Sequence, residues 1–248
     1  MRQTSCPQSF RRPKPAFYQR GIHFQHNKGG LFKISEQKIK QQNAITPMKI
    51  KIIGFSILAV IITAFTTSTN KGEIVKTSEF QKFIDTIGLK FSMPADYKET
   101  YVKENANLWY CFAMKDKKAT FEVRYSIWSL KPMIEDYEKC KLDPNCISVS
   151  PNVIYEGRIQ SNVLNMTGGQ EWDIGAFPPN AVKQEFNADA GGSSFFEFNC
   201  DFGKGYKYGH MVYLHKDDVA DVIITFMSND KTTHSELMSK SFHALTFK

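Results

Sequence analysis

A short basic stretch followed by an apolar run stands inside the chain, and it limits which part of the chain can fold as a domain. Met48-Lys49-Ile50-Lys51 precedes Ile52 to Phe65, 14 residues without a charge. A membrane-spanning helix needs roughly 20 apolar residues, whereas a secretory signal needs about 7–15. The length favours a signal peptide that spans residues 48–68. An uncleaved N-terminal membrane anchor and a buried helix are the alternatives. Residues 1–47 are then predicted to be a disordered or misassigned upstream segment.

The charge of the chain divides at the same place. Nine Lys and Arg against the single acid Glu36 give residues 1–47 a net charge of +8, and Lys49 and Lys51 add two. Because the whole chain carries +7, residues 69–248 hold −3. A basic chain ordinarily suggests nucleic-acid or membrane-surface binding. Here the excess lies outside the expected domain, so no nucleic-acid partner is expected, and membrane contact is expected only through residues 50–68 if they stay uncleaved.

Residues 69–248 are predicted to form a single globular domain, because roughly 180 residues suffice for one core and no internal repeat divides them. Helical spacing of apolar residues predicts helices at 79–87, 132–140 and 233–244. Strands are predicted at 89–93 and 245–247, in a hairpin of 107–114 with 120–128, and in a meander of 194–202, 206–215 and 221–227.

The section from 150 to 190 carries weaker signals. Two strands are expected there, around 153–160 and 170–174, with loops at Gly168-Gly169 and Pro178-Pro179. Helices near both ends of the domain and a largely antiparallel sheet between them predict an α+β fold, a mostly antiparallel sheet flanked by helices.

Two short motifs stand at the ends of this region. Gly88-Leu89-Lys90-Phe91-Ser92-Met93-Pro94 opens it, and Ser241-Phe242-His243-Ala244-Leu245-Thr246-Phe247 closes it. Together they resemble the opening and closing motifs of PsbP-like domains. The resemblance implies an α/β/α layered sandwich. It also implies a binding or accessory role without catalysis, since most PsbP-like proteins are photosystem subunits, exported bacterial proteins or binding partners of other proteins.

Cysteine usage agrees with export. Outside the upstream segment the chain has four cysteines, an even count that allows two disulfides in three connectivities. Cys140 and Cys146 bracket a proline-containing turn that can bring them together, which would leave Cys111 with Cys200. Four separate buried thiols are the alternative, because spacing alone does not prove pairing.

No metal or cofactor site is expected. His210 and His215 stand an odd number of residues apart on one predicted strand, so they point to opposite faces and do not make a two-histidine site. Asp217, Asp218 and Asp221 lack the ligand spacing of an EF-type loop, and they are expected to form a solvated acidic turn.

The remaining candidates divide between binding and catalysis. Trp109, Trp128 and Trp172 are candidate binding residues, with core packing as the alternative. Cys200 and His210 lie one hairpin apart and suggest a nucleophile with its base.

We expect an exported, non-catalytic binding or accessory protein of the bacterial cell envelope. It would be periplasmic, secreted or membrane-anchored, with a protein or small-molecule partner. The alternative is a secreted hydrolase that uses Cys200 and His210.

Overall fold

The structure is a computed structural model that describes residues 72–248. The expected upstream segment (1–47) and the signal or anchor segment (48–68) lie outside the described residues. Within the described part, no helix is both long enough and apolar enough to cross a membrane. The described elements follow in the order β1 (Glu73–Ile74), α1 (Thr77–Asp85), β2 (Leu89–Phe91), β3 (Tyr97–Glu99), β4 (Tyr101–Val102), β5 (Phe112–Asp116), β6 (Phe121–Ser129), α2 (Lys131–Lys141), η2 (Pro151–Val153), α3 (Ile154–Thr167), β7 (Gly175–Ala176), α4 (Pro179–Phe186), β8 (Ala190–Glu197), η3 (Asp201–Gly203), β9 (Tyr208–Lys216), β10 (Ala220–Ser228), α5 (Lys231–Ser239) and β11 (Leu245–Phe247).

Seven strands form the central sheet in the order β3-β5-β6-β10-β9-β8-β7, and every neighbouring pair is antiparallel. The three central strands, β6, β10 and β9, have nine residues each, and β10 pairs along its whole length with both neighbours. Two further pairs, β2 with β11 and β1 with β4, stand outside this sheet. The expected α+β fold with a mostly antiparallel sheet is confirmed.

One face of the sheet carries the larger core. Side chains alternate between the two faces along each strand, and this face carries Tyr125 of β6, Leu214 of β9 and Ile224 of β10. There they meet α1, α4, α5 and the β2–β11 pair. Phe80 of α1 stacks on Phe112 of β5, with ring centroids 4.3 Å apart and planes at 4°. Helices therefore cover this face along its length.

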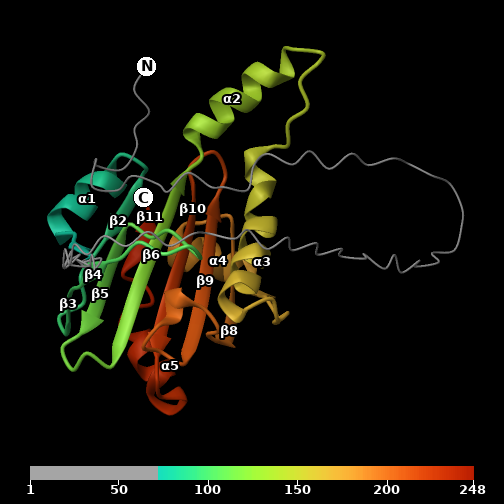
Figure 1. Cartoon of the computed structure of the whole chain (residues 1–248). Helices are drawn as coiled ribbons and strands as arrows, with labels where there is room; N and C mark the ends of the chain where they lie inside the picture. Colours follow the sequence, from blue (N-terminus) through green and yellow to red (C-terminus); the bar gives the residue numbers. More distant parts are fainter. Residues whose placement is uncertain (1–71) are drawn as a thin grey trace, which may run out of the picture. The chain divides into compact units, whose positions relative to one another are not determined.

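The opposite face is covered by α3 and by irregular chain (Figure 1). Ile159 and Val163 of α3 pack with Met211 and Ile223 of the sheet. Towards the other end of the face, Arg124 donates to the carbonyl of Phe202 in η3, and its guanidinium lies 4.6 Å from the Phe202 ring centroid and 4.8 Å from that of Tyr110. A buried Glu122 carboxylate, 2.6 Å from Arg124 Nε, balances the charge. The sheet is thus the middle of three layers.

The hairpin and the meander form largely where the sequence places them, as β5–β6 and β8–β9–β10. The expected edge strand at 245–247 is β11, which pairs with β2. Helix α1 begins two residues earlier than expected, and the Glu79 carboxylate accepts the Lys76 N–H at 3.3 Å. Gly88 takes the expected left-handed conformation, with φ 87°.

The expectation for 150–190 is wrong in two places. Residues 153–160, expected as a strand, belong to η2 and α3, because Ile159, Val163 and Met166 are buried at helical spacing and override the β-branched residues at the start. The strand expected at 170–174 is irregular, and β7 follows it with only two residues. The loop expected at Pro178-Pro179 opens α4, where proline is tolerated in the first turn because its missing N–H has no helical partner.

The disulfide expected between Cys140 and Cys146 is formed, with a Cα–Cα distance of 5.3 Å. The pairing of Cys111 with Cys200 is not formed, because the two thiols belong to clusters on opposite faces of the sheet. Cys111 Sγ lies 3.3 Å from the Tyr125 carbonyl, and Cys200 Sγ lies 3.6 Å from Met166 Sδ. The alternative of four separate buried thiols is wrong for Cys140 and Cys146.

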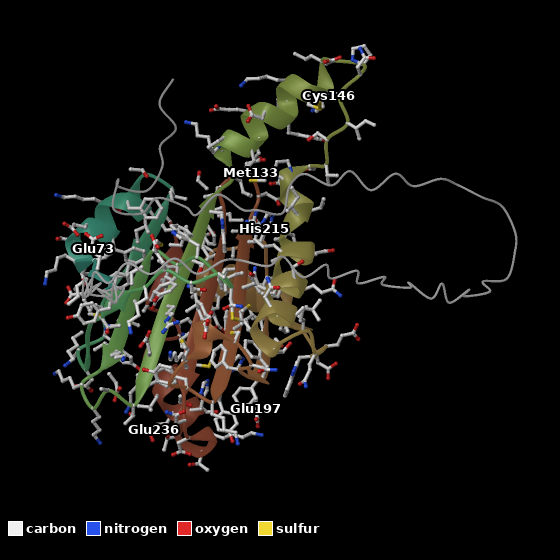
Figure 2. The ribbon with its side chains drawn as sticks, in the orientation of Figure 1. Glu73, Met133, Cys146, Glu197, His215 and Glu236 are labelled. Carbon is white, nitrogen blue, oxygen red and sulfur yellow. A yellow bond between two sulfur atoms is a disulfide. The ribbon has the colours of Figure 1, made fainter. Side chains whose placement is uncertain are left out.

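The disulfide closes the end of a projecting helix. None of the α2 residues is buried, and Figure 1 shows α2 standing away from the sheet. Figure 2 places Cys146 at its far end. Leu142, inside the disulfide loop, and Ile147, directly after it, are 87% and 99% exposed. The bridge therefore constrains a segment that has little core of its own.

Reduction of this disulfide should loosen the projecting segment and leave the sheet intact. A short disulfide loop restrains its own chain, but none of the α2 residues contributes to either core. We expect faster hydrogen exchange at amides 138–147 in a Cys140→Ser/Cys146→Ser variant, with unchanged exchange in β9 and β10. Faster exchange in those central strands would contradict this account of α2.

Candidate binding groove

Two adjoining hollows lie between α3 and the chain that follows it, and we call them together the α3 groove. The first has a volume of about 370 Å³ and is bounded by α3, by Ala176 and Phe177, and by the start of β8. The second, about 630 Å³, is bounded by α3 and residues 171–174. Gln160 and Ile174 line both hollows, so the two are neighbours. Each volume falls in the range of ligand sites, roughly 300–1,000 Å³.

The wall on α3 follows from helical periodicity. Glu156, Ile159, Gln160, Val163 and Leu164 line the groove, at spacings of three and four residues that place them along one stripe of the helix. The buried members of the stripe bind the helix to the sheet, and the exposed members border the groove. Helix α3 ends at Gly168, whose left-handed φ of 69° turns the chain back alongside the helix.

The opposite wall depends on a close approach between β7 and β8. A Cβ atom on Gly192 would lie 2.3 Å from the Gly175 carbonyl oxygen and 2.7 Å from a ring carbon of Tyr213. Only glycine leaves room there for both neighbours. Gly192 thus lets β7 pair with β8 while Tyr213 from β9 borders the first hollow.

A buried charge network attaches the beginning of α3 to the sheet. Asp221 of β10 accepts from Arg158 of α3 through one carboxylate oxygen and lies 2.6 Å from His215 Nδ1 through the other. His215 Nε2 lies 2.9 Å from Asp217 Oδ1. The Arg158 guanidinium also lies 4.7 Å from the ring centroid of Trp128. The solvated acidic turn expected from the sequence is therefore wrong for Asp221, which is 2% exposed because it is the acceptor of this network.

His215 is held as a cation by this arrangement. Burial by itself lowers its pKa, but the hydrogen bonds and charges of Asp221 and Asp217 outweigh burial and raise the pKa above its ordinary value. A protonated imidazole with a carboxylate on each nitrogen has no lone pair for a proton or a metal ion. Tyr155, which lines the first hollow, stacks on the His215 ring at a centroid distance of 4.3 Å. Figure 2 shows His215 in place beside α3.

The three candidate tryptophans have different surroundings. Trp172 lines the second hollow and is 37% exposed. Trp128 packs beneath Arg158, and Trp109 lies 6.3 Å from Trp128 between ring centroids. Trp109 and Trp128 are only partly accessible and take part in packing. Of the three, Trp172 is the one the structure places in the groove.

Cys200 and His210 are not brought together. Cys200 belongs to the cluster beneath α3, whereas His210 faces the other side of the sheet and stacks near His234 of α5, with 5.9 Å between ring centroids. Burial raises the pKa of Cys200 despite the nearby N–H groups of Gly203 and Phe202, which keeps it a thiol. The expectation that His210 and His215 face opposite sides of the sheet is confirmed. In residues 72–248, no three His, Cys, Asp or Glu side chains are grouped so that they could hold a metal ion.

Sequence reasoning missed most of the groove. Tyr155, Glu156 and Gln160 were hidden by the interpretation of 153–160 as a strand, which assigns their side chains to two faces instead of one helical stripe. The signal that could have found them is the spacing of Ile159, Val163 and Met166 before Gly168.

Comparison with known proteins adds little. No protein-family model matches the chain, and no curated protein matches it. Among solved structures, it is similar to the solution structure of cyanobacterial PsbP (CyanoP) from Synechocystis sp. PCC 6803, with 9% identity and a TM-score of 0.38 over 74% of this chain and 96% of that chain. This is a weak resemblance at the level of the fold, and it carries no argument about family or function.

The stability contributed by His215 should fall as pH rises. The pKa of His215 in the folded chain lies above the ordinary value of about 6.5. Its contribution to stability is therefore fully present below about pH 6.5 and is lost as the pH rises through the raised pKa. We expect the difference in unfolding free energy between the native chain and a His215→Gln variant to be largest in acid and to shrink in alkali. Urea unfolding between about pH 5 and 9 measures it. A difference that grows with pH would contradict the cationic assignment.

The pair His210 and His234 should have the opposite effect. Burial lowers the pKa of each to about 4, and for His210 the neighbouring His234 adds to the effect. As the pH falls, the two histidines become protonated in the unfolded chain before they do in the folded chain. The free energy of unfolding should therefore fall as the pH drops from about 6.5 to 4, by on the order of 2 kcal/mol per histidine. A His210→Gln/His234→Gln variant should lose less stability over that interval. Equal acid sensitivity of the two proteins, or NMR titration of both rings near pH 6.5, would contradict it.

Proposed function

We propose that this chain is a binding or accessory protein without catalytic activity, and that it holds its partner in the α3 groove. The single observation that carries the proposal is the groove itself: two adjoining hollows of ligand size, the second of which is lined by the partly exposed Trp172. Aromatic side chains with an exposed face are frequent anchors for a bound partner.

The titratable groups near the groove support binding over catalysis. His215, which stacks on Tyr155 of the first hollow, has a carboxylate at each ring nitrogen and so lacks the free lone pair that a general base requires. The hydrolase alternative requires Cys200 and His210 to act together, but they belong to opposite faces of the sheet. A nucleophile needs its base within hydrogen-bond reach, which counts against this alternative.

The proposal places the protein outside the cytoplasm, in the bacterial cell envelope. Its support is the signal-like segment at residues 48–68 together with the Cys140–Cys146 disulfide, since disulfides persist in oxidising compartments. In this setting the partner is a protein or a small molecule. The net charge of −3 on residues 69–248 argues against nucleic acid.

Site-specific crosslinking tests the groove as the binding surface. A photoreactive phenylalanine derivative replaces Trp172 in the full chain, in the native cells, and a control chain carries it at Tyr101, which is 49% exposed on β4. We expect an adduct of defined mass from position 172 and none of that mass from position 101.

A second substitution decides whether the adduct depends on the groove. Gln160→Trp places a large ring between the two hollows at an exposed helix position and should abolish the adduct. Ser161→Trp adds the same ring one residue along α3, outside the groove lining, and should preserve it. An adduct that survives Gln160→Trp, or that forms equally from position 101, would overturn the proposed binding surface.

A further inference from the structure

The charges along the α3 groove are of one sign. Glu156 and Asp189 line the first hollow, and Glu171 and Asp173 line the second. Within the described part of the chain, no Lys, Arg or His is among the lining residues. Lys183 Nζ lies 3.1 Å from Asp189 and neutralises it from outside the groove. Within residues 72–248, Glu156, Glu171 and Asp173 form no ion pair, so three carboxylates of the groove walls have no cationic partner in that range.

Between these carboxylates the groove is apolar and aromatic. Ile174 contributes partly exposed apolar surface, and Tyr155, Trp172 and Tyr213 contribute rings. The negative faces of aromatic rings attract cations, so the rings and carboxylates favour the same sign of ligand charge. The apolar surface adds a gain for a ligand that also carries hydrocarbon.

The length of the groove suits a short stretch of extended chain. From Glu156 to Leu164 the helix rises by roughly 12 Å, at about 1.5 Å per residue. An extended peptide covers that distance with about four residues. Successive side chains of such a peptide point to opposite sides, so alternate residues can meet the carboxylates while the others meet the apolar surface.

We propose that the α3 groove binds an extended peptide segment in which cationic and apolar side chains alternate. This inference rests on the proposed function and assigns the chemistry of the partner. About two lysine or arginine side chains fit along the groove and pair with the carboxylates of Glu156, Glu171 and Asp173, and the intervening apolar side chains lie against Ile174 and the Trp172 ring.

The test uses the full chain and a fluorescein-labelled peptide of nine residues that alternate lysine and leucine. A glutamate–leucine peptide and a lysine–serine peptide of the same length are the controls, and fluorescence anisotropy reports binding at low and at high salt. We expect tight binding of the lysine–leucine peptide alone, weakened by salt because the carboxylates are exposed to solvent.

Matched variants locate the binding. Glu156→Gln/Glu171→Gln/Asp173→Asn removes the three groove charges and should weaken binding about tenfold. Glu73→Gln/Glu104→Gln/Glu135→Gln removes three exposed charges elsewhere and should change binding less than about twofold. Equal binding by the two variants, or equal binding of the glutamate–leucine or lysine–serine peptide, would overturn the proposed ligand class.

The failure of this inference and that of the proposed function are distinguishable. If crosslinking from position 172 is blocked by Gln160→Trp while the lysine–leucine peptide does not bind, the groove binds a partner of other chemistry and only this inference is overturned. If the crosslink also fails to depend on the groove, both proposals are overturned.

Discussion

The attachment of α3 to the sheet through Asp221 is the interaction on which the rest of the described structure depends. Asp221 has 2% of its surface exposed, and its two carboxylate oxygens serve two cations, Arg158 of α3 and His215 of β9. Removing charges from water is unfavourable, and the loss of one partner from such a buried group typically costs about 3–5 kcal/mol. The network therefore fixes one orientation of α3, and with it the helical stripe that forms a wall of the groove. The stack of Tyr155 on His215 extends the same network to the groove surface.

The sheet keeps apart the histidine and cysteine side chains that could otherwise form a catalytic site. His210 and His234 lie on the face covered by α5, where burial keeps them neutral, whereas His215 lies on the face covered by α3, where two carboxylates keep it charged. Cys200 shares the face of α3 with Met166, and His215 on that face has a carboxylate at each ring nitrogen. The solvent-exposed surface on the α3 side is a groove lined by carboxylates and aromatic rings. That distribution is the physical basis for proposing a binding role.

The sequence predicts the sheet far better than the groove. Strict alternation in β6 and the short turns of the β8–β9–β10 meander depend on local pattern and local chain reversal, so they can be recognised without tertiary information. The opposite orientations of His210 and His215 follow from the same period of two. Helix α3 is harder to recognise, because Val153 and Ile154 at its start favour strand, and the helical spacing of its later apolar residues is decisive only once they pack against Met211 and Ile223. The burial of Asp221 likewise depends on Arg158, 63 residues away in the sequence.

A double-mutant cycle between Arg158 and Asp221 tests the central claim, that this buried network holds α3 on the sheet. Unfolding free energies of the native chain, Arg158→Met, Asp221→Leu and the double variant are measured by urea denaturation, with hydrogen exchange of the α3 amides as the structural readout. The account predicts a favourable coupling of about 1.5 kcal/mol or more, and loss of protection in α3 before β10 in either single variant. Free energies that add within about 0.5 kcal/mol, with α3 equally protected in all four proteins, would contradict it.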